Sequence, residues 1–466
     1  MSNTPSFQLN RLISPNHFSG SRYTEVRAQE NRMLRIALLN GASVANVSQT
    51  ERGVSARSLD RGCWGFASLP DLDSAAIERV IRQAESNANA LSKRMGREHP
   101  FAKIQGAQGS QDESTKKAKL TTGELQERLK NWDAVIQKKY PEVKNRSLTL
   151  RQQNFIKEGL NSEGASTAMH FARSHVYIQL GMDSSSGPVA MMDVLGGMGE
   201  IEDTWFSDEL FLERIEEQIR HLKNKANGIR PEAGRHTVIL ASDLAGILAH
   251  EAVGHTTEAD LVKGGSVARE ALGKVVASPL VSLVDFAHTA LGKKVPAPVY
   301  FDDEGVTAKD TTIIDQGVLK SWMHNKETAA EFGVEATGHA RAWAFNDEPL
   351  IRMRNTAILP GQSRLQDMIA SIDDGYFLMN SGNGQADSTS EFMFAVTMGY
   401  EIKKGKLGRA LLDTTVSGVA FDMLKTVSMV STEFEWEDAG TCGKKQPMFV
   451  GMGGPAIKCE IALGGQ

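Results

Sequence analysis

The sequence predicts an α+β fold in two parts, a mixed α+β N-terminal domain over residues 1–230 and a β-rich C-terminal domain over residues 231–466. Three observations predict this. At 466 residues the chain is too long for one core, because single hydrophobic cores stop growing at roughly 250–300 residues. The first half mixes strand-like and helix-like periods, whereas the second half has short apolar runs between glycine-containing turns. The 41% hydrophobic residues, 23% charged residues and 43 glycines are typical of a compact globular protein with many turns.

The N-terminal domain is predicted to begin with a sheet. Between Tyr23 and Leu69, apolar and polar residues alternate with the period of a strand, and glycine and asparagine interrupt the pattern. The clearest runs are Arg35–Leu39, Ser43–Val47 and Gly53–Leu59. The alternation returns at Ser147–Ile156 and His170–Leu180, which a turn-rich stretch over residues 161–164 connects.

Three amphipathic helices accompany this sheet. The first is Ser74–Leu91, with Asp73 or Ser74 as its N-cap, and the second is Thr122–Tyr140, which Pro141 stops. Between them, residues 104–119 are rich in Gly, Gln, Ser and Lys and predict a long exposed loop. The third helix, Asp208–Asn227, is strongly charged and is predicted to connect the two domains.

The C-terminal domain is predicted to start with a strand at Thr237–Leu240, followed by a helix that Ser242 or Asp243 caps and that runs toward His250. Beyond residue 295 the pattern is largely β. The apolar runs are Thr311–Ile314, Phe392–Met398 and Ala410–Thr415, and the turns include Gln316-Gly317 and Lys404-Gly405. The sequence contains no internal repeat with a clean period.

Charge and cysteine content exclude several classes of protein. The formal net charge is −5, so no positive field favours direct binding of nucleic acid or of a membrane surface. Three cysteines are too few for a disulfide framework and predict a reducing compartment, the cytoplasm. Met1–Gly20 has no apolar run of signal-peptide length, and nowhere do ~18 apolar residues follow one another, so neither export nor membrane insertion is expected.

The segment His250-Glu-Ala-Val-Gly-His255 contains the elements of a zinc-peptidase helix, with one residue too many. In His-Glu-x-x-His the two imidazoles stand about 40° apart around an α-helix, so both reach one ion. Here the spacing of five residues corresponds to about 140°. Ligation by both histidines therefore predicts a π-type turn or a local unwinding, which Gly254 is placed to permit. The alternative is a regular helix with one packed and one exposed histidine.

A third protein ligand is expected, because catalytic zinc commonly takes three and keeps a fourth position for water. The candidates are Cys442, Glu258, Asp260, His288, His324 and His339. Cys442 stands in a glycine-flanked turn that would bring a thiolate close to an ion, although a lone cysteine in such a turn is more often a packing residue. Glu251 directly follows His250 and is the candidate general base, since it would reach water rather than the metal.

The remaining motifs carry no predicted chemistry. Cys63 and Cys459 lie in segments that indicate buried strands, and both are interpreted as structural. The glycine-rich stretches at residues 196–199 and 451–454 lack the strand and helix context of a dinucleotide site and the Lys-Ser/Thr ending of a P-loop.

In this order along the chain, four stretches resemble the TldD/PmbA family, whose members are also described as proposed modulators of DNA gyrase. They are Glu51–Ser68, His250–Asp260, Asp302–Lys320 and Gly440–Pro455. TldD-like members keep the His-Glu-x-x-x-His helix and the late cysteine, whereas the PmbA/TldE type lacks them and serves as a non-catalytic partner. The resemblance therefore implies His250, His255 and Cys442 as ligands of one divalent metal, most simply zinc, with Glu251 as the base.

The resemblance also implies function and assembly. It implies a metallopeptidase in which metal-activated water attacks the peptide carbonyl of an unfolded or extended substrate. It implies a homodimer, or a heterodimer with a PmbA/TldE-like subunit, that encloses the active site. It associates the segment around His339 with the approach of substrate. Two alternatives stay open at this point: a regulatory or binding subunit that keeps a structural metal, and a gyrase modulator without catalysis.

Overall fold

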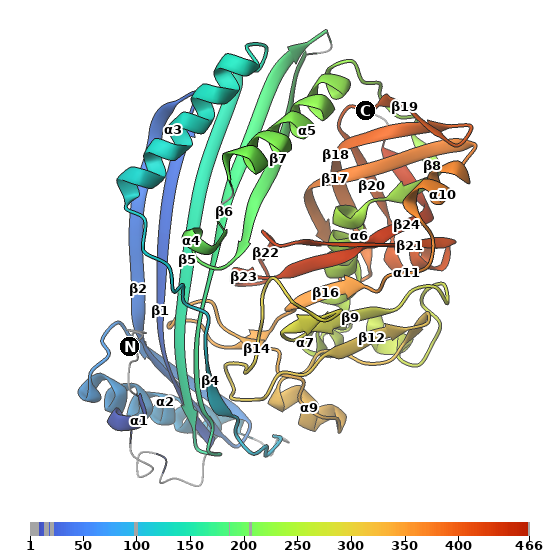
Figure 1. Ribbon diagram of the computed structural model, residues 1–466. Coiled ribbons are helices and arrows are strands. Elements are labelled where there is room, and N and C mark those ends of the chain that lie inside the picture. The colour runs from blue at the N-terminus through green and yellow to red at the C-terminus, as the bar shows by residue number, and fades with distance from the viewer. Residues whose placement is uncertain are drawn as a thin grey trace.

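The computed structural model describes residues 9–13, 18, 23–96, 101–185, 187–204 and 207–464, and Figure 1 shows them as two sheets side by side. The segment Met1–Gly20 lies mostly outside these residues. The first sheet has seven strands and the second eleven, and in the described chain no strand belongs to both. The α+β class that the sequence predicts is confirmed.

The N-terminal sheet runs in the order β3-β2-β1-β5-β6-β4, and β7 also pairs with β6. Its strands are β1 (Tyr23–Leu39), β2 (Ala42–Asp60), β3 (Cys63–Leu69), β4 (Gln108–Asp112), β5 (Asn145–Asn161), β6 (Ser166–Ser184) and β7 (Gly187–Met198). Tight turns at Asn40-Gly41 and Arg61-Gly62 join the first three strands. All four turn residues have positive φ, as two-residue hairpin turns of this kind require.

The strands are longer than the sequence predicts, and one loop prediction is wrong in part. The separate runs 43–47 and 53–59 belong to a single strand, β2. Within the predicted exposed loop over residues 104–119, β4 pairs in parallel with the start of β6. The polar sequence of β4 gives no alternating pattern, because most of its residues are exposed.

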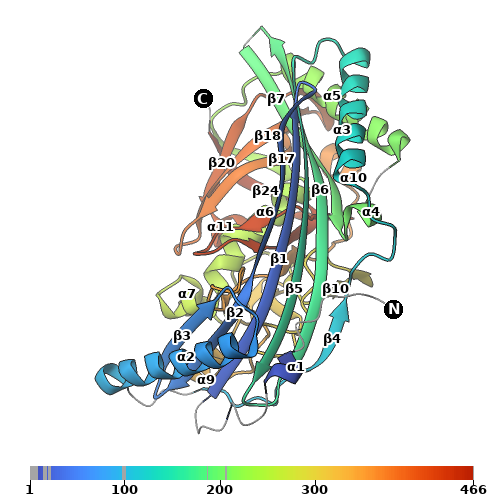
Figure 2. The same ribbon diagram turned by 90° about the vertical axis from the view of Figure 1, so that its left-hand side faces the viewer.

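Three helices cover the N-terminal sheet: α2 (Ser74–Met95), α3 (Thr122–Lys139) and α5 (Asp208–Ala226). Their predicted starts are confirmed, and in α2 the side chain of Asp73 accepts a hydrogen bond from the Ala76 amide. The aromatic rings of Trp132 and Phe211 stack at 3.9 Å, which packs α3 against α5. Two single-turn helices, α1 (Leu9–Leu12) and α4 (Ile201–Thr204), complete this half. Figure 2 shows α2 and α3 at opposite ends of the long strands.

The two faces of β1 contact different parts of the molecule. Val26 and Ala28 belong to the apolar cluster under α2. The intervening side chains point to the C-terminal half: Arg27 donates to the carbonyl oxygen of Ala344 (3.0 Å), and Gln29 donates to that of Trp343. Buried polar groups need such partners, so this strand fixes the N-terminal sheet against the second half of the chain.

The C-terminal sheet follows the order β13-β12-β9-β16-β24-β20-β18-β17-β8, with β24 also pairing β8 and β21, and with β19 on β18. Its strands are β8 (Gly234–Leu240), β9 (Leu283–Phe286), β12 (Thr311–Asp315), β13 (Val318–Leu319), β16 (Asn355–Ile358), β17 (Asp374–Ala386), β18 (Glu391–Lys403), β19 (Lys406–Ala410), β20 (Thr414–Val419), β21 (Met429–Glu437) and β24 (Gly451–Gly464). Short pairs outside the sheet are β10 (Thr289–Ala290) with β11 (Lys293–Lys294), β14 (Ala340–Arg341) with β15 (Leu350–Ile351), and β22 (Thr441–Cys442) with β23 (Met448–Phe449).

Most predicted C-terminal elements are confirmed, and two predictions are wrong. The helix over Ser242–Leu248 has Ala241 as its N-cap and no side-chain cap, because the carboxylate of Asp243 instead accepts hydrogen bonds from Ser381. The turns at Gln316-Gly317 and Lys404-Gly405 are present with positive φ at each residue. The predicted strand Ala410–Thr415 falls between two strands, because β19 ends at Ala410 and β20 begins at Thr414. There the chain turns away, and the amide of Leu412 bonds to the carbonyl oxygen of Ile229.

The main C-terminal core lies around a helical segment that crosses this sheet. The segment consists of α6 (Ser242–Leu248), a π-helix (Ala249–Gly254), a 3₁₀ turn (His255–Thr257) and α7 (Ala259–Lys263). The other helices are α8 (Ala268–Ala271), α9 (Lys326–Phe332), α10 (Leu365–Ala370) and α11 (Ala420–Lys425). Within the described part of the chain, no helix has the length and apolarity that a membrane span requires.

Candidate metal centre

The predicted departure from α geometry between the two histidines is confirmed. Ala249–Gly254 forms a π-helix, and the amide of His255 bonds to the carbonyl oxygen of His250, five residues earlier. A π-turn contains more residues per turn than an α-helix, so side chains five residues apart lie on the same face of the helix. The rings of His250 and His255 lie 5.1 Å apart between centroids, at an interplanar angle of 77°.

Gly254 is needed for space rather than for an unusual backbone angle. Its φ of −55° and ψ of −54° are ordinary helical values. The expected reason for this glycine, a backbone conformation that other residues tolerate poorly, is therefore wrong. A Cβ atom at this position would lie 2.0 Å from Sδ of Met353. The glycine thus lets the π-turn pack directly against the buried Met353 side chain.

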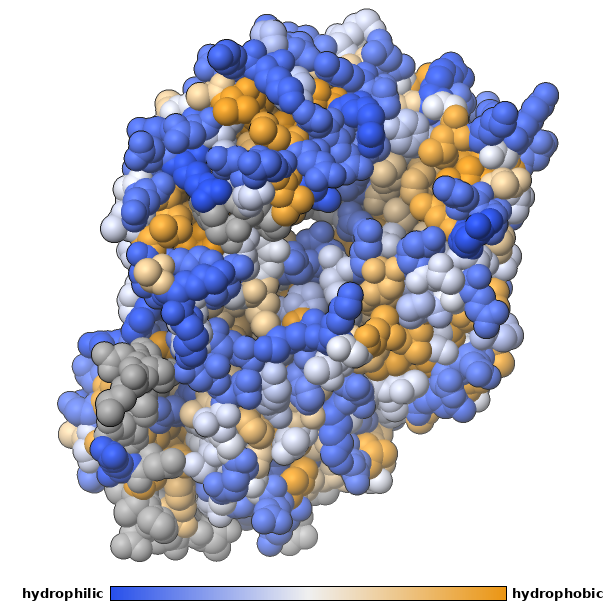
Figure 3. Space-filling model, in the orientation of Figure 1, coloured by the Kyte–Doolittle hydropathy of each residue, from blue (hydrophilic) through white to orange (hydrophobic). Residues whose placement is uncertain are grey.

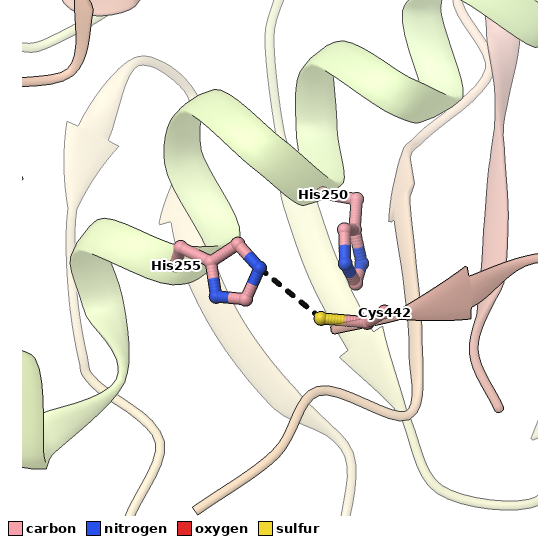
Figure 4. A group of neighbouring side chains, drawn as sticks. All are labelled: His250, His255 and Cys442. Carbon is pink, nitrogen blue, oxygen red and sulfur yellow. Dashed lines mark hydrogen bonds between the residues drawn. The ribbon is translucent and has the colours of Figure 1, made fainter. Parts of the chain in front are cut away.

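Cys442 completes a group of three metal-binding side chains. It lies in β22, and its Sγ is 3.2 Å from Nε2 of His255. One donor atom each from His250, His255 and Cys442 lie within 4.8 Å of one another. Figure 4 shows the cysteine sulfur and the two imidazoles converging from opposite sides of a small space. In the described chain this is the one group of three or more His, Cys, Asp or Glu residues with such spacing.

Two arginines hold the backbone around Cys442. The fully buried Arg352 donates from Nη2 to the carbonyl oxygen of Cys442 (3.0 Å) and from Nη1 to that of Gln446 (2.6 Å). From the N-terminal sheet, Arg173 donates to the carbonyl oxygen of Gly440 (3.1 Å). The position of the cysteine therefore depends on both halves of the molecule.

The residues present fit a metal ion such as zinc. His250 is fully buried, and neither of its ring nitrogens has a hydrogen-bond partner among the described residues. An unpaired buried polar group costs free energy, and coordination of an ion would remove that cost. Two imidazole nitrogens and one thiolate are a donor set that zinc prefers, and three protein ligands leave one tetrahedral position open.

The electrostatics favour the ligand form of the cysteine. Burial alone would raise the pKa of Cys442, but the neighbouring imidazoles of His250 and His255 lower it to about 4. Burial likewise opposes a charged His255, but the carboxylate of Glu258 raises the pKa of His255. Since the thiolate rather than the thiol binds metals, the site holds Cys442 in the form that binds.

Glu251 lies beside this group without belonging to it. Its carboxylate oxygens are 4.0 Å from Nε2 of His250 and 3.6 Å from Nε2 of His255. Its side chain keeps 21% of its surface exposed, whereas His250 is fully buried. Glu251 therefore lies next to the group and is partly exposed to solvent.

The structure does not bring the other carboxylate candidates into the group. Glu258 accepts a hydrogen bond from Nδ1 of His255 (2.7 Å), so it contacts the far side of that ring. Asp260 pairs with Nζ of Lys444 at 2.7 Å. Both residues therefore contact neighbours of the three metal-binding side chains rather than the space between them.

The three other histidine candidates lie elsewhere. The ring of His288 stacks on that of Tyr300 at 4.7 Å. His324 is buried, and its Nδ1 pairs with Oγ1 of Thr328. His339 is fully buried, with Nε2 3.0 Å from Oδ1 of Asp285 and Nδ1 2.7 Å from Oγ1 of Thr337. With both nitrogens engaged and no exposed surface, His339 itself does not face an approaching substrate, contrary to the expectation for its segment.

The molecule is hollowed between its two halves. Figure 3 shows an opening between the upper part of the N-terminal sheet and the C-terminal sheet, at the height where Figure 1 places β22.

Comparison with known proteins matches both halves of the chain. A family model described as PmbA/TldA metallopeptidase C-terminal domain matches residues 233–465, and PmbA/TldA metallopeptidase domain 1 matches residues 24–88. A metalloprotease from Methanocaldococcus jannaschii is 31% identical over 444 residues, which cover 94% of this chain and 95% of the relative. The chain belongs to the TldD/PmbA family of metallopeptidases.

Other TldD/PmbA relatives extend the likeness. A protein from Saccharolobus solfataricus named as a zinc metalloprotease TldD homolog is 28% identical over 418 residues, 89% of this chain and 90% of the relative. Among solved structures, TldE from Thermococcus kodakarensis has a TM-score of 0.73 at 17% identity and covers 98% of this chain and all of its own. A Thermotoga maritima protein described as a proposed modulator of a DNA gyrase has a TM-score of 0.78 at 19% identity, with coverage of 98% and 99%. At these identities the two structures show a shared fold.

The metalloprotease relatives and the metallopeptidase family model make this chain a metal-dependent peptidase. The group of two histidines and one cysteine is where its residues fit a metal. Sequence reasoning missed the residues around that group. Arg352 and Lys444 were not singled out, although Lys444 lies in the stretch Gly440–Pro455. The remaining cysteines are outside the site: Cys63 begins β3, and Cys459 is buried in β24.

Proposed function

We propose that this chain is a zinc peptidase in which His250, His255 and Cys442 hold the ion and Glu251 is the general base. The observation that carries the proposal is the convergence of three donor atoms within 4.8 Å, one of them on a fully buried histidine with no other partner among the described residues. The name of the Saccharolobus relative, a zinc metalloprotease, supports zinc as the metal.

The side chains divide the work of peptide hydrolysis. When bound, the ion lowers the pKa of a water molecule and polarises the carbonyl group of the peptide bond. The carboxylate of Glu251, through Oε1 or Oε2, accepts the proton of the attacking water and then passes it to the nitrogen of the leaving amine.

The substrate class we propose is an unfolded or extended peptide. β17 pairs with β8 only over Tyr376–Leu378, but with β18 as far as Ala386. Within the described residues, the last part of β17 therefore has a strand partner on one side only, and β17 contacts the π-helix of the metal centre. An unpaired strand edge binds an extended chain through its backbone. At Ser381 the amide already donates to Asp243, so the substrate is proposed to pair beyond it, along residues 382–386 of β17.

Assembly and location belong to the same proposal. We propose a domain boundary near residue 230, which the change of sheet between β7 and β8 supports, and a homodimer or a heterodimer with a PmbA/TldE-like subunit. The fold shared with TldE supports such pairing. We also propose a cytoplasmic location, which the three free cysteines support.

A structural-metal subunit is the main competing function. A closed structural site takes four protein ligands, and among the described residues no fourth His, Cys, Asp or Glu joins the group. The test is hydrolysis of an unstructured peptide by the purified chain, alone and with its proposed partner, before and after removal of metal with a chelator. We expect activity that is lost on chelation and restored by zinc. A chain that binds zinc but hydrolyses nothing in either form would contradict the proposal.

A further inference from the structure

One lysine links the cysteine loop to the histidine segment. Lys444 follows Cys442 by two residues, and its Nζ lies 2.7 Å from Oδ2 of Asp260 and 3.3 Å from Oε2 of Glu258. It also donates to the carbonyl oxygen of Ile351 (3.1 Å). Both carboxylates stand just after His255 in the chain. A single ammonium group therefore joins the two segments that carry His255 and Cys442.

Glu258 in turn contacts His255 on the side away from the metal-binding space. The carboxylate oxygen Oε2 of Glu258 lies 2.7 Å from Nδ1 of His255, and Glu258 has no exposed surface. An ionised carboxylate only accepts hydrogen bonds, so Nδ1 carries the proton and donates it. Nε2 is then the nitrogen that would bind an ion, and it lies 3.2 Å from the sulfur of Cys442.

We infer that Glu258 and Lys444 are positioning residues of the metal centre: Glu258 fixes the tautomer and orientation of His255, and Lys444 holds the Cys442 loop against it. This inference rests on the proposed metal-binding role of His250, His255 and Cys442. Carboxylates that accept the second N–H of a ligating histidine act in this way in other metal sites.

Stability alone does not account for this arrangement. Taking Glu258 and Lys444 out of water is costly, and a buried ion pair commonly contributes no more than an apolar replacement would. Oε1 of Glu258 has no hydrogen-bond partner among the described residues, so the pair is not even fully satisfied. Its two contacts, to the Nδ1 atom of a ligand histidine and to the loop of the ligand cysteine, are those that orient the ligand atoms.

The test measures the affinity of the full-length chain for Zn²⁺ by chelator competition, and the absorption of the Co²⁺-substituted chain, whose thiolate charge-transfer band reports the cysteine ligand. The variants are Glu258→Ala, Glu258→Gln and Lys444→Met. The control is Asp133→Asn, which breaks the buried pair between Asp133 and Arg146 (2.9 Å) in the N-terminal half. Thermal unfolding is followed for each variant.

We expect Glu258→Ala to weaken Zn²⁺ binding by about 10- to 100-fold, the range found for such partners of ligand histidines. Glu258→Gln should recover part of that loss, because its amide oxygen still accepts the Nδ1 proton. Lys444→Met should weaken binding and alter the charge-transfer band. Asp133→Asn should lower the unfolding temperature without changing the affinity. If Glu258→Ala does not fold, Glu258→Gln and Lys444→Met carry the test.

Wild-type affinity in both Glu258→Gln and Lys444→Met would overturn the inference. A loss in Glu258→Gln as complete as that in Cys442→Ala would also overturn it, since Glu258 would then be a ligand. If Asp133→Asn lost as much Zn²⁺ affinity as the Glu258 and Lys444 variants, their loss would reflect general destabilisation of the fold. That outcome also contradicts a positioning role. Failure of the proposed function gives a different result from failure of this inference. If the wild-type chain bound no Zn²⁺, or if Cys442→Ala bound it unchanged, the proposed metal centre would be wrong and the inference would fall with it.

Discussion

The sulfur of Cys442 lies 3.2 Å from Nε2 of His255, although 187 residues separate the two along the chain. The contact joins β22 to the 3₁₀ turn that follows the π-helix, and Arg352 and Arg173 hold the cysteine segment in place. The metal centre is therefore assembled by the fold of both halves rather than by one local motif.

Substitution of the general base should separate chemistry from metal binding. Glu251→Gln removes the proton acceptor but leaves the three donor atoms in place, so we expect hydrolysis of an unstructured peptide to fall by about 10²- to 10⁴-fold. Bound metal and unfolding temperature should stay close to wild type. Loss of the metal together with the activity would make Glu251 a ligand, and wild-type activity would remove it from the mechanism.

Gly254→Ala should destabilise the π-turn. Alanine has better helix propensity by about 1 kcal/mol, but the added Cβ would lie 2.0 Å from Sδ of the buried Met353, and overpacking costs about 1–3 kcal/mol. We expect a net loss of stability and weaker metal binding. Chemical unfolding measures the first and chelator competition the second.

The matched control for this change is Gly123→Ala in α3. Gly123 is exposed, and the nearest atom to an added Cβ is 3.9 Å away, so this substitution should be neutral or stabilising by up to about 1 kcal/mol. If Gly254→Ala were as stable as Gly123→Ala and bound metal with wild-type affinity, the Met353 side chain would have moved aside without cost. The close packing would then not be required.

Two buried histidines should make stability depend on pH. Burial lowers the pKa of His324 to about 4, and burial together with Arg354 lowers that of His339 to about 4. An unfolded histidine binds its proton near pH 6.5. Between about pH 6.5 and 4 the unfolded chain therefore binds protons that the folded chain does not, so stability falls as the pH falls, by up to about 1.4 kcal/mol per pH unit for each group.

Urea unfolding of wild type and His324→Gln at several pH values between 4.5 and 7 checks this expectation. The variant should lose less stability over this range than wild type, because one of the two titrating groups is gone while the carboxylates are unchanged. Parallel pH dependence of the two proteins would show that His324 is not held neutral in the fold.

Helix ends and hairpin turns were predictable from the sequence because the signals are local. Asp73 caps α2 as predicted, and Thr121, which was not singled out, caps α3 in a capping box with Glu124. β24 was not predicted as a long strand, because Gly453, Gly454 and Pro455 interrupt its pattern. Its pairing with β8, β16, β20 and β21 gives it a central place that local propensity does not encode.

In the candidate site, too, local signals were predictable from the sequence and long-range contacts were not. The five-residue spacing of His250 and His255 predicted the π-turn, because helix geometry alone excludes ligation without one. Cys442 was one of six candidates for the third ligand, and only the family resemblance singled it out. The ion pairs of Lys444 were beyond prediction, since they depend on a contact between Lys444 and Asp260 that only the folded chain creates.

Selection of extended substrates should appear as a difference in cleavage rate between an unfolded and a folded form of one sequence. If the substrate pairs with the free edge of β17, an unfolded peptide should be cleaved, whereas the same sequence locked inside a stable domain should not. Cleavage assays on both forms, with the mass of the enzyme measured in solution, check this. Comparable rates on the two substrates, or a fully active monomer, would contradict the proposed enclosed dimer.

Metal content of purified wild type, Cys442→Ala and Cys459→Ala tests the central claim most directly. Cys459 is buried in β24, away from the group of three, so its substitution controls for loss of a buried thiol. The account predicts one zinc ion per chain in wild type and Cys459→Ala, and a large loss in Cys442→Ala. Full zinc occupancy in Cys442→Ala, with wild-type affinity, would contradict it.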